Sequence, residues 1–248
     1  QGNQTIILTV GGLEQEITVI PSAPALYDFS THTFTNCSVT GRSGPSITQM
    51  RSAYSSAAWK DDYLDADVPG FQLWTVPETA IYTIDVRSAT GQAYSSNNRR
   101  GYGYRLRGSF DLEKGTVLEI AVGQGGHGGG GSGGGSFVLT KDGSARTPLI
   151  IAGGGGGQDG RYSHTNGDGH SGSNGKNSSD GYNGGQNGQG GTSGGASNGG
   201  GGGGLLSNGT NFPNNGGGGY LQSGTLTSGV VNSNSLYGGN PNGGFGGG

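Results

Sequence analysis

The stretch GQGGHGGGGSGGG, residues 123–135, decides how this chain can fold. Shorter glycine runs follow it at residues 153–157, 199–204, 216–219 and 246–248. Only 7 of the 60 glycines fall in the first hundred residues, and apolar stretches such as SFVL (136–139) and PLIIA (148–152) alternate with the runs. A flexible tether does not alternate with apolar segments in this way, so we expect the runs to be ordered rods.

Rods of glycine need a source of stabilisation other than side chains. Glycine loses more backbone entropy on ordering than any other residue. Polyproline-II geometry has three residues per turn and no internal hydrogen bonds, so its backbone groups point outward to neighbouring chains. The sequence therefore predicts a bundle of polyglycine-II helices whose core is backbone. A disordered low-complexity tail is the alternative.

The composition leaves room for one modest conventional core. Hydrophobic residues make up 29% and charged residues 12% of the 248 residues, against roughly 45–50% and 25% in ordinary globular chains. We expect three parts: an N-terminal hairpin or strand-exchange segment at 1–24, a β-sandwich part at 25–152, and a glycine-rich bundle with polar loops at 123–135 and 153–248. This bundle is expected to be incomplete at its C-terminal end.

Several classes of function have no support in the sequence. The net charge of −3 gives no electrostatic case for nucleic acid. No run of about 18 apolar residues is present, so we expect no membrane insertion. Residues 123–128 match G-x-G-x-x-G, but GGSGGG follows and cannot open the helix that dinucleotide binding needs. We expect no cofactor and no enzyme, because no catalytic constellation is present.

Two other features also have ordinary explanations. Cys37 is the single cysteine, which excludes a disulfide within the chain, and we expect it to be a small buried residue. Four aspartates, Asp61, Asp62, Asp65 and Asp67, lack the glycine and the closing glutamate of an EF-hand loop. A solvated acidic loop is the interpretation that we prefer, and no metal site is expected.

Short apolar stretches with turn signals between them predict an antiparallel sandwich or jelly roll with almost no helix. Residues 5–10 and 13–20 form a hairpin across Gly11 and Gly12, which is either the end of an upstream module or a free edge for another copy. Two further pairs are expected, 71–76 with 80–86 and 102–110 with 116–122. A short helix at 46–56 would have Ser46 as its N-cap.

Six segments of the chain resemble a known family. They are TGRSGPSITQMRSAY (40–54), GFQLWTVPETAIYTI (70–84), GSFDLEKGTVLEIAVGQGG (108–126), GGGSFV (133–138), PLIIAGGGG (148–156) and GGFGGG (243–248). The sequence resembles the glycine-rich ectodomain of the anaplastic lymphoma kinase and leukocyte tyrosine kinase type, and related microbial glycine-rich domains. The resemblance implies a jelly roll like that of tumour necrosis factor, packed on a hexagonal bundle of polyglycine helices.

The chain also departs from this family. The receptors have a second cysteine near the position of Met50, and they have a closing strand after a further glycine run, neither of which is present here. The resemblance therefore extends to the scaffold and does not carry over cytokine binding.

Two sets of residues are candidates for interaction or modification. Guanidinium and aromatic groups are mixed at Arg99, Arg100, Tyr102, Tyr104 and Arg105, which suits binding of sugars or peptides, although a solvated strand edge would look the same. N-x-S/T sequons, which accept glycans only on a secretory route, begin at Asn3, Asn36, Asn177 and Asn208.

The function we expect is that of a non-catalytic structural or adhesive domain, located extracellularly, on a cell surface or on a virion surface. Its rigid glycine bundle would display the polar loops 158–186, 205–216 and 221–240 to a cell-surface glycan or protein. One alternative is a fibre subunit that self-associates through the strands from Thr5 to Ile20. Another is a receptor ectodomain fragment that binds a small protein ligand.

Overall fold

The structure, a computed structural model, is mainly β. It describes residues 4–10, 13–19, 23–40, 43–92, 100–126, 132–156, 168, 174, 184–187, 189, 191–192 and 206–208. The elements are β1 (Gln4–Val10), β2 (Leu13–Val19), α1 (Ile47–Ala53), β3 (Leu64–Asp65), β4 (Phe71–Thr75), β5 (Ala80–Arg87), β6 (Arg105–Leu112), β7 (Val117–Ala121), β8 (Ser136–Asp142) and β9 (Ala145–Ala152). The expected fold class, antiparallel β with almost no helix, is confirmed for this part of the chain.

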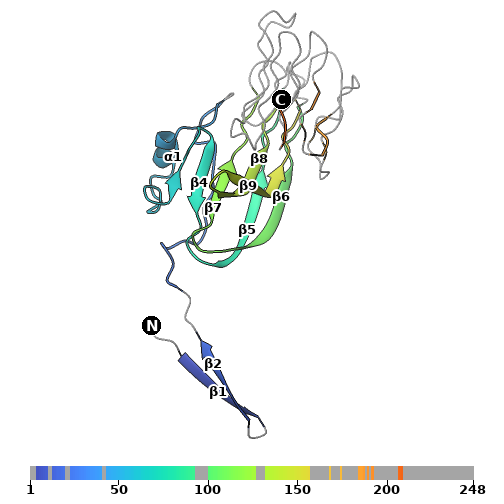
Figure 1. Cartoon of the computed structure of the whole chain (residues 1–248). Coiled ribbons are helices and arrows are strands. Elements are labelled where there is room, and N and C mark those ends of the chain that lie inside the picture. The colour runs from blue at the N-terminus through green and yellow to red at the C-terminus, as the bar shows by residue number, and fades with distance from the viewer. Residues whose placement is uncertain are drawn as a thin grey trace, which may run out of the picture.

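The strands form two packed sheets and one separate hairpin. The larger sheet has the order β3-β4-β7-β8-β9, and the smaller one consists of β5 and β6, with every pair antiparallel. The hairpin of β1 and β2 is confirmed and extends away from these sheets in both views (Figure 1). β3 had no clear sequence signal because it is only two residues long.

The two expected hairpins of the middle region are wrong, although their strands exist. β4 pairs with β7, and β5 pairs with β6. The links 76–79 and 113–116 carry the chain from one sheet to the other, and they lie side by side: the Val76 amide donates to the Thr116 carbonyl at 2.8 Å, and the Gly115 amide donates to the Val76 carbonyl at 2.9 Å. Gly115 has a φ of 86°, which favours glycine at this corner.

Burial explains why the chain changes sheets at these links. β4 is buried along nearly its whole length, whereas β5 and β6 alternate between exposed and covered positions. A strand covered on both faces pairs best with a similarly covered neighbour, which here is β7. The expected strand at 102–110 also begins later, at Arg105, because residues 102–104 belong to a different kind of structure described below.

The main core lies between the inner faces of the two sheets and under α1. Its fully or nearly buried members include Met50, Trp59, Trp74, Leu118 and Ile120. Aromatic rings from the segment 27–34 complete it, and Phe29 lies 4.9 Å from Trp74 between ring centroids. Large aromatic surfaces give a core of high apolar area in a chain with few hydrophobic residues.

The expected helix is confirmed, with a shorter C-terminal end. Ser46 is its N-cap and forms a capping box with Gln49: the Gln49 amide donates to Ser46 Oγ at 3.3 Å, and the Ser46 amide donates to Gln49 Oε1 at 2.8 Å. α1 ends at Ala53, and Tyr54 is its C-cap. Met50 is the helix residue that is buried in the core.

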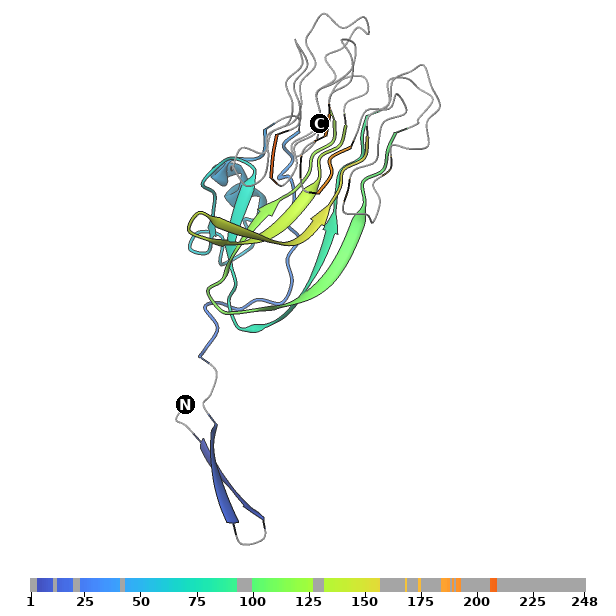
Figure 2. The same ribbon diagram turned by 45° about the vertical axis from the view of Figure 1, so that its right-hand side comes forward.

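Five segments without regular secondary structure continue the strands at one end of the sandwich. We call residues 88–92, 100–104, 122–126, 132–135 and 153–156 the end segments. They follow β5, β7 and β9 and precede β6 and β8, so the antiparallel order brings all five to the same end (Figure 2). Figure 2 shows them running side by side beyond the strands.

Backbone hydrogen bonds join the end segments in more than one plane. Segment 88–92 bonds to three others: the Ala89 amide donates to the Gly134 carbonyl at 3.0 Å, the Gly91 amide to the Gly101 carbonyl at 2.9 Å, and the Gly155 amide to the Ala89 carbonyl at 3.0 Å. Segment 153–156 also has three partners, because the Gly101 amide donates to the Gly156 carbonyl at 3.1 Å and the Gly133 amide donates to the Gly155 carbonyl at 2.7 Å.

The three bonded neighbours of segments 88–92 and 153–156 exclude a flat sheet, since a strand in a sheet has only two edges. The described end segments therefore pack as a bundle joined by main-chain groups. The rods predicted at 199–204, 216–219 and 246–248 lie outside the described residues, as do 127–131 and Gly157. Polyglycine-II geometry itself stays a prediction.

Glycine is required in the end segments for close approach. An added Cβ would lie 2.0 Å from the Gly133 carbonyl oxygen at Gly154, 2.0 Å from the Gly101 oxygen at Gly155, and 2.1 Å from the Gly134 oxygen at Gly123. Among the described glycines only Gly70, Gly115 and Gly143 have positive φ, and none of them is in an end segment. The selection for glycine there is thus steric.

Neighbouring glycines provide a matched test of this packing. Gly154→Ala should destabilise the chain by about 1–3 kcal/mol, because the new methyl group overlaps backbone that cannot rotate away. Gly153→Ala should be neutral or stabilising by roughly 0.4–1 kcal/mol, because nothing lies within 4 Å of its Cβ and its φ is not positive. Urea unfolding of both variants measures the difference. Equal stabilities would contradict the close packing.

His32 lies inside the aromatic core in an unusual environment. Its ring meets those of Phe34, Tyr54 and Trp59 edge-on, at centroid distances of 4.8, 4.6 and 4.8 Å. Its Nε2 atom is buried and has no hydrogen-bond partner. Burial disfavours the imidazolium form and lowers the pKa of His32 below its usual 6.5.

This environment predicts a pH dependence of folding. Because the pKa of His32 is lower in the folded than in the unfolded chain, the unfolded chain binds more protons between the two values. Stability should therefore be full above about pH 6.5 and fall as the pH drops from there through the folded-state pKa. Chemical denaturation between pH 4 and 8 should show a smaller acid loss for His32→Phe than for the native chain. Superimposable pH profiles would show that His32 is not the group responsible.

Candidate functional site: the outer face of the β5–β6 sheet

The sequence-predicted binding residues lie where the 100–104 end segment enters β6. Arg100 and Tyr102 are exposed, the latter to 61%, and the Tyr102 amide donates to Asp168 Oδ1 at 2.7 Å. Tyr104 is half-buried, and its amide donates to the Gly153 carbonyl at 3.0 Å. Arg105 is the first residue of β6 and is exposed. Arg99 lies outside the described residues.

The exposed positions of β5 and β6 together form one surface, which we call the outer face. Alternate residues of each strand are exposed, and the register sets them opposite one another: Arg87 with Arg105, Asp85 with Arg107, Thr83 with Ser109, and Ile81 with Asp111. Basic groups gather at the end nearest the end segments. Hydroxyl groups follow, and the Thr83 and Ser109 hydroxyls are 3.2 Å apart.

One carboxylate organises the basic end of the outer face. Arg105 Nε donates to both Asp85 oxygens, at 2.9 and 3.1 Å, and Arg105 Nη2 also donates to Asp85 Oδ2. Arg87 Nε lies 3.7 Å from Asp85 Oδ1, which is an ion pair without a hydrogen bond. The hydrogen bond from Arg105, with the charges of Arg105, Arg87 and Arg107, holds the pKa of Asp85 below its usual value.

Sequence reasoning missed Arg87, Arg107 and Asp85. Their alternation along β5 and β6 was a usable signal, but it identifies one surface only if these two strands are paired. Because the sequence favoured pairing each strand with its neighbour across a short link, the arginines of the two strands were not brought together.

The other candidate residues do not join this surface. Asn36 is half-buried in a turn where Cys37 and Ser38 have φ values of 52° and 61°, and its Nδ2 donates to the Val39 carbonyl at 2.8 Å. Asn208 is exposed. Asn3 and Asn177 lie outside the described residues.

Cys37 is half-buried, so the expectation that it is a buried residue is wrong. Its sulfur lies 3.5 Å from the Tyr54 hydroxyl. Cys37 packs against the main core as one of its partly buried neighbours.

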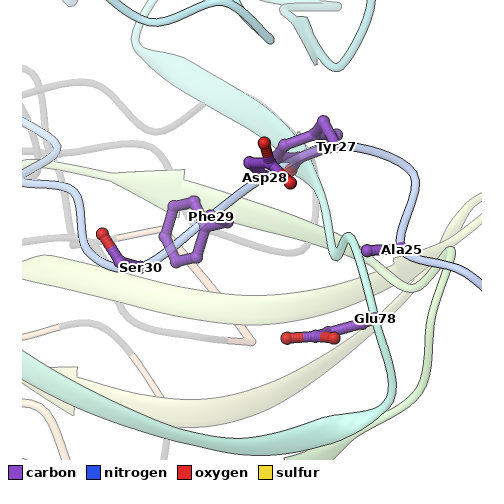
Figure 3. Close-up of a pocket in the computed structure, with 6 residues that line it drawn as sticks. All are labelled: Ala25, Tyr27, Asp28, Phe29, Ser30 and Glu78. Atoms are coloured by element: carbon purple, nitrogen blue, oxygen red, sulfur yellow. The ribbon is translucent and has the colours of Figure 1, made fainter.

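An open depression lies at the β4–β5 link, at the opposite end of the sandwich from the end segments. It has a volume of about 330 Å³ and is lined by Ala25, Tyr27, Asp28, Phe29, Ser30 and Glu78 (Figure 3). Asp28 and Glu78 contribute carboxylates, but no lining residue is a histidine, cysteine or lysine that could form a nucleophile and base pair.

Two of the four aspartates of the acidic loop form ion pairs with lysines. Asp61 pairs with Lys60, and Asp67 pairs with Lys141. Within the described ranges, no three histidine, cysteine, aspartate or glutamate residues are grouped closely enough to hold a metal ion. Nor is any described helix long and apolar enough to cross a bilayer.

The fold and the site define an antiparallel β domain with a backbone-bonded end and a basic outer face. No protein-family model matches the chain. The chain is 34% identical over 129 residues to the leukocyte tyrosine kinase receptor of Mus musculus. This match covers 48% of the chain and 14% of the receptor, so the chain spans about a seventh of that protein's length. The comparison supports the resemblance read from the sequence over about half of the chain.

Proposed function

We propose that the chain is a non-catalytic extracellular recognition domain, in which a rigid bundle of polyglycine-II rods holds polar loops toward a partner. The observation that carries this proposal is the three-way hydrogen bonding of the end segments. A segment that is hydrogen-bonded on three sides resists bending in each of those directions. A strand at the edge of a sheet is hydrogen-bonded on one side only and bends more easily.

Rigid end segments would fix the points from which the loops start. Gln92 and Arg100 flank residues 93–99, Gly126 and Ser132 flank 127–131, and Gly156 precedes the polar region from 157 onward. Binding loops positioned by a rigid framework lose less entropy on binding than loops on a flexible tether. The part from 25 to 152 would then be the sandwich, of the jelly-roll kind, and the residues from 153 would extend the bundle.

Similarity to a receptor supports an extracellular location and a protein partner. The relative's name describes a receptor, and the match extends over 129 residues. Because that region is a small part of the receptor, we take over neither its catalytic activity nor its ligand. A fragment of a receptor ectodomain that binds a small protein remains the closest variant of the proposal.

The display role is tested by replacing the loops and keeping the rods. Residues 158–186, 205–216 and 221–240 would each be replaced by a short Gly-Ser linker, and the labelled chains measured for binding to a panel of cells and to a glycan array. We expect at least one replacement to lower binding about tenfold or more without changing the unfolding midpoint. Undiminished binding by all three replacements would overturn the display role.

A second candidate function is assembly through β1 and β2. In the described part of the chain these two strands pair only with each other, and Figures 1 and 2 show them extended from the sandwich. A two-stranded hairpin alone is marginally stable in water and leaves both edges unpaired. A second copy of the chain could supply the missing strands.

Sedimentation analysis distinguishes this second candidate. The full chain should form dimers or larger assemblies at concentrations at which Ile7→Pro, which removes a β1 backbone donor, is monomeric. A native chain that stays monomeric at millimolar concentration would rule out assembly through the hairpin.

A further inference from the structure

The basic end of the outer face concentrates charge of one sign in a protein of net charge −3. Arg87, Arg105, Asp85 and Arg107 occupy the corners of a four-residue array set by the β5–β6 register. Opposite residues in such an array are about 5 Å apart between Cβ atoms, and residues two apart on a strand are separated by roughly 6.8 Å. Three guanidinium groups therefore share one carboxylate.

Two of these three arginines have unused hydrogen-bond donors. Both oxygens of Asp85 accept hydrogen bonds from Arg105. Arg87, whose side chain is 69% exposed, approaches Asp85 without a hydrogen bond. The Arg107 guanidinium forms no hydrogen bond or ion pair with any residue that the structure describes. Each guanidinium has five N–H donors in a planar fork, so the surface offers donors for a further anion.

The pair of Arg105 and Asp85 shows which kind of anion this surface accommodates. A carboxylate lies flat against the guanidinium and accepts bonds through both oxygens, the geometry in which charge-assisted hydrogen bonds are strongest. A second carboxylate, supplied by a ligand, would meet the forks of Arg107 and Arg87 in the same way. A ligand with regularly repeated carboxylates could place one carboxylate at each of these guanidinium groups.

Features around the arginines favour a sugar chain over a peptide. β5 and β6 form a sheet of two strands, and a peptide that added to a free edge would extend the sheet sideways without covering the arginines of the outer face. Tyr102, which is 61% exposed, lies three residues before Arg105 and offers an aromatic ring. The Thr83 and Ser109 hydroxyls lie further along the same face. Aromatic and hydroxyl groups beside arginines suit a polyhydroxylated ring.

We propose that the outer face of the β5–β6 sheet binds a linear polysaccharide with repeated carboxylate groups, with Arg87 and Arg107 as its principal anchors. Arg105 stays paired with Asp85 and adds positive charge, and Tyr102 contacts a sugar ring. This inference names a ligand class for the recognition role proposed above and rests on that role. The surface is nevertheless separate from the loops 158–186, 205–216 and 221–240.

Charge-matched variants of the full chain test the site. Fluorescence anisotropy with labelled polygalacturonate oligosaccharides, at low ionic strength, measures the affinity. Arg87→Gln combined with Arg107→Gln should weaken binding about tenfold, because two exposed ionic contacts are lost. Lys60→Gln combined with Lys114→Gln removes the same charge away from the outer face and should leave binding unchanged. Asp85→Asn should strengthen binding several-fold, because it releases Arg105.

The outcomes separate this site from the other possibilities. Equal weakening by the arginine and lysine pairs, or no binding of polygalacturonate by the native chain, would overturn the site. Equal competition by poly-glutamate would replace the polysaccharide with an acidic protein, and preference for dextran sulfate would replace the carboxylate with a sulfate. Chains with replaced loops should still bind polygalacturonate. The test of this site therefore gives a clear result even if the loops prove to have no display role. Unchanged far-ultraviolet circular dichroism verifies that the variants fold.

Discussion

Lateral hydrogen bonding between main-chain groups is the interaction on which this structure depends. Segments without side chains cannot be held by hydrophobic burial, which stabilises most domains. In the end segments the amides of Ala89, Gly133 and Gly155 each reach a carbonyl of a different segment. Because these groups are removed from water, leaving any one of them unpaired would be unfavourable by about 1–3 kcal/mol. Each of these lateral hydrogen bonds therefore contributes to the stability of the bundle.

The sandwich and the end segments depend on each other. The antiparallel order of β5 to β9 brings five chain segments to one end, and only that convergence allows three-way bonding. In return, the end segments tie β5 and β6 to β7, β8 and β9 beyond the point at which the sheets end. Ser136 links the two parts directly, since its hydroxyl accepts from the Gly123 amide at 2.9 Å and donates to the Arg87 carbonyl at 2.8 Å.

Sequence patterns predicted the local features well and the long-range pairing poorly. The Ser46 and Gln49 capping box and the Gly11-Gly12 hairpin are local, because each is decided within a few residues. The glycine runs also predicted their own steric role, since only glycine permits backbone contact at 2.0 Å from a Cβ position such as that of Gly154. β5 pairs with β6 and not with β4 because β4 is buried on both faces. This burial is a property of the assembled sandwich, and the short link between β4 and β5 gives no sign of it in the sequence.

The candidate site was predictable in part for the same reason. Arg100, Tyr102 and Arg105 follow one another in the chain, so their mixture of charge and aromatic surface was visible. Arg87 comes from a strand 18 residues earlier and joins them only through the β5–β6 register. Arg105 is hydrogen-bonded to Asp85 and is therefore not a free guanidinium group. Only these hydrogen bonds in the structure show that a carboxylate fits this face.

Amide hydrogen exchange at single residues tests the lateral hydrogen bonds most directly. In a ¹⁵N-labelled chain, the amides of Ala89, Gly101, Gly133 and Gly155 should exchange as slowly as those in the centres of β7 and β8, because they open only when the fold opens. Exchange of these four amides at the rate of an unstructured glycine peptide, with β7 and β8 still protected, would contradict the account. The glycine-rich end would then be a tether attached to a small sandwich.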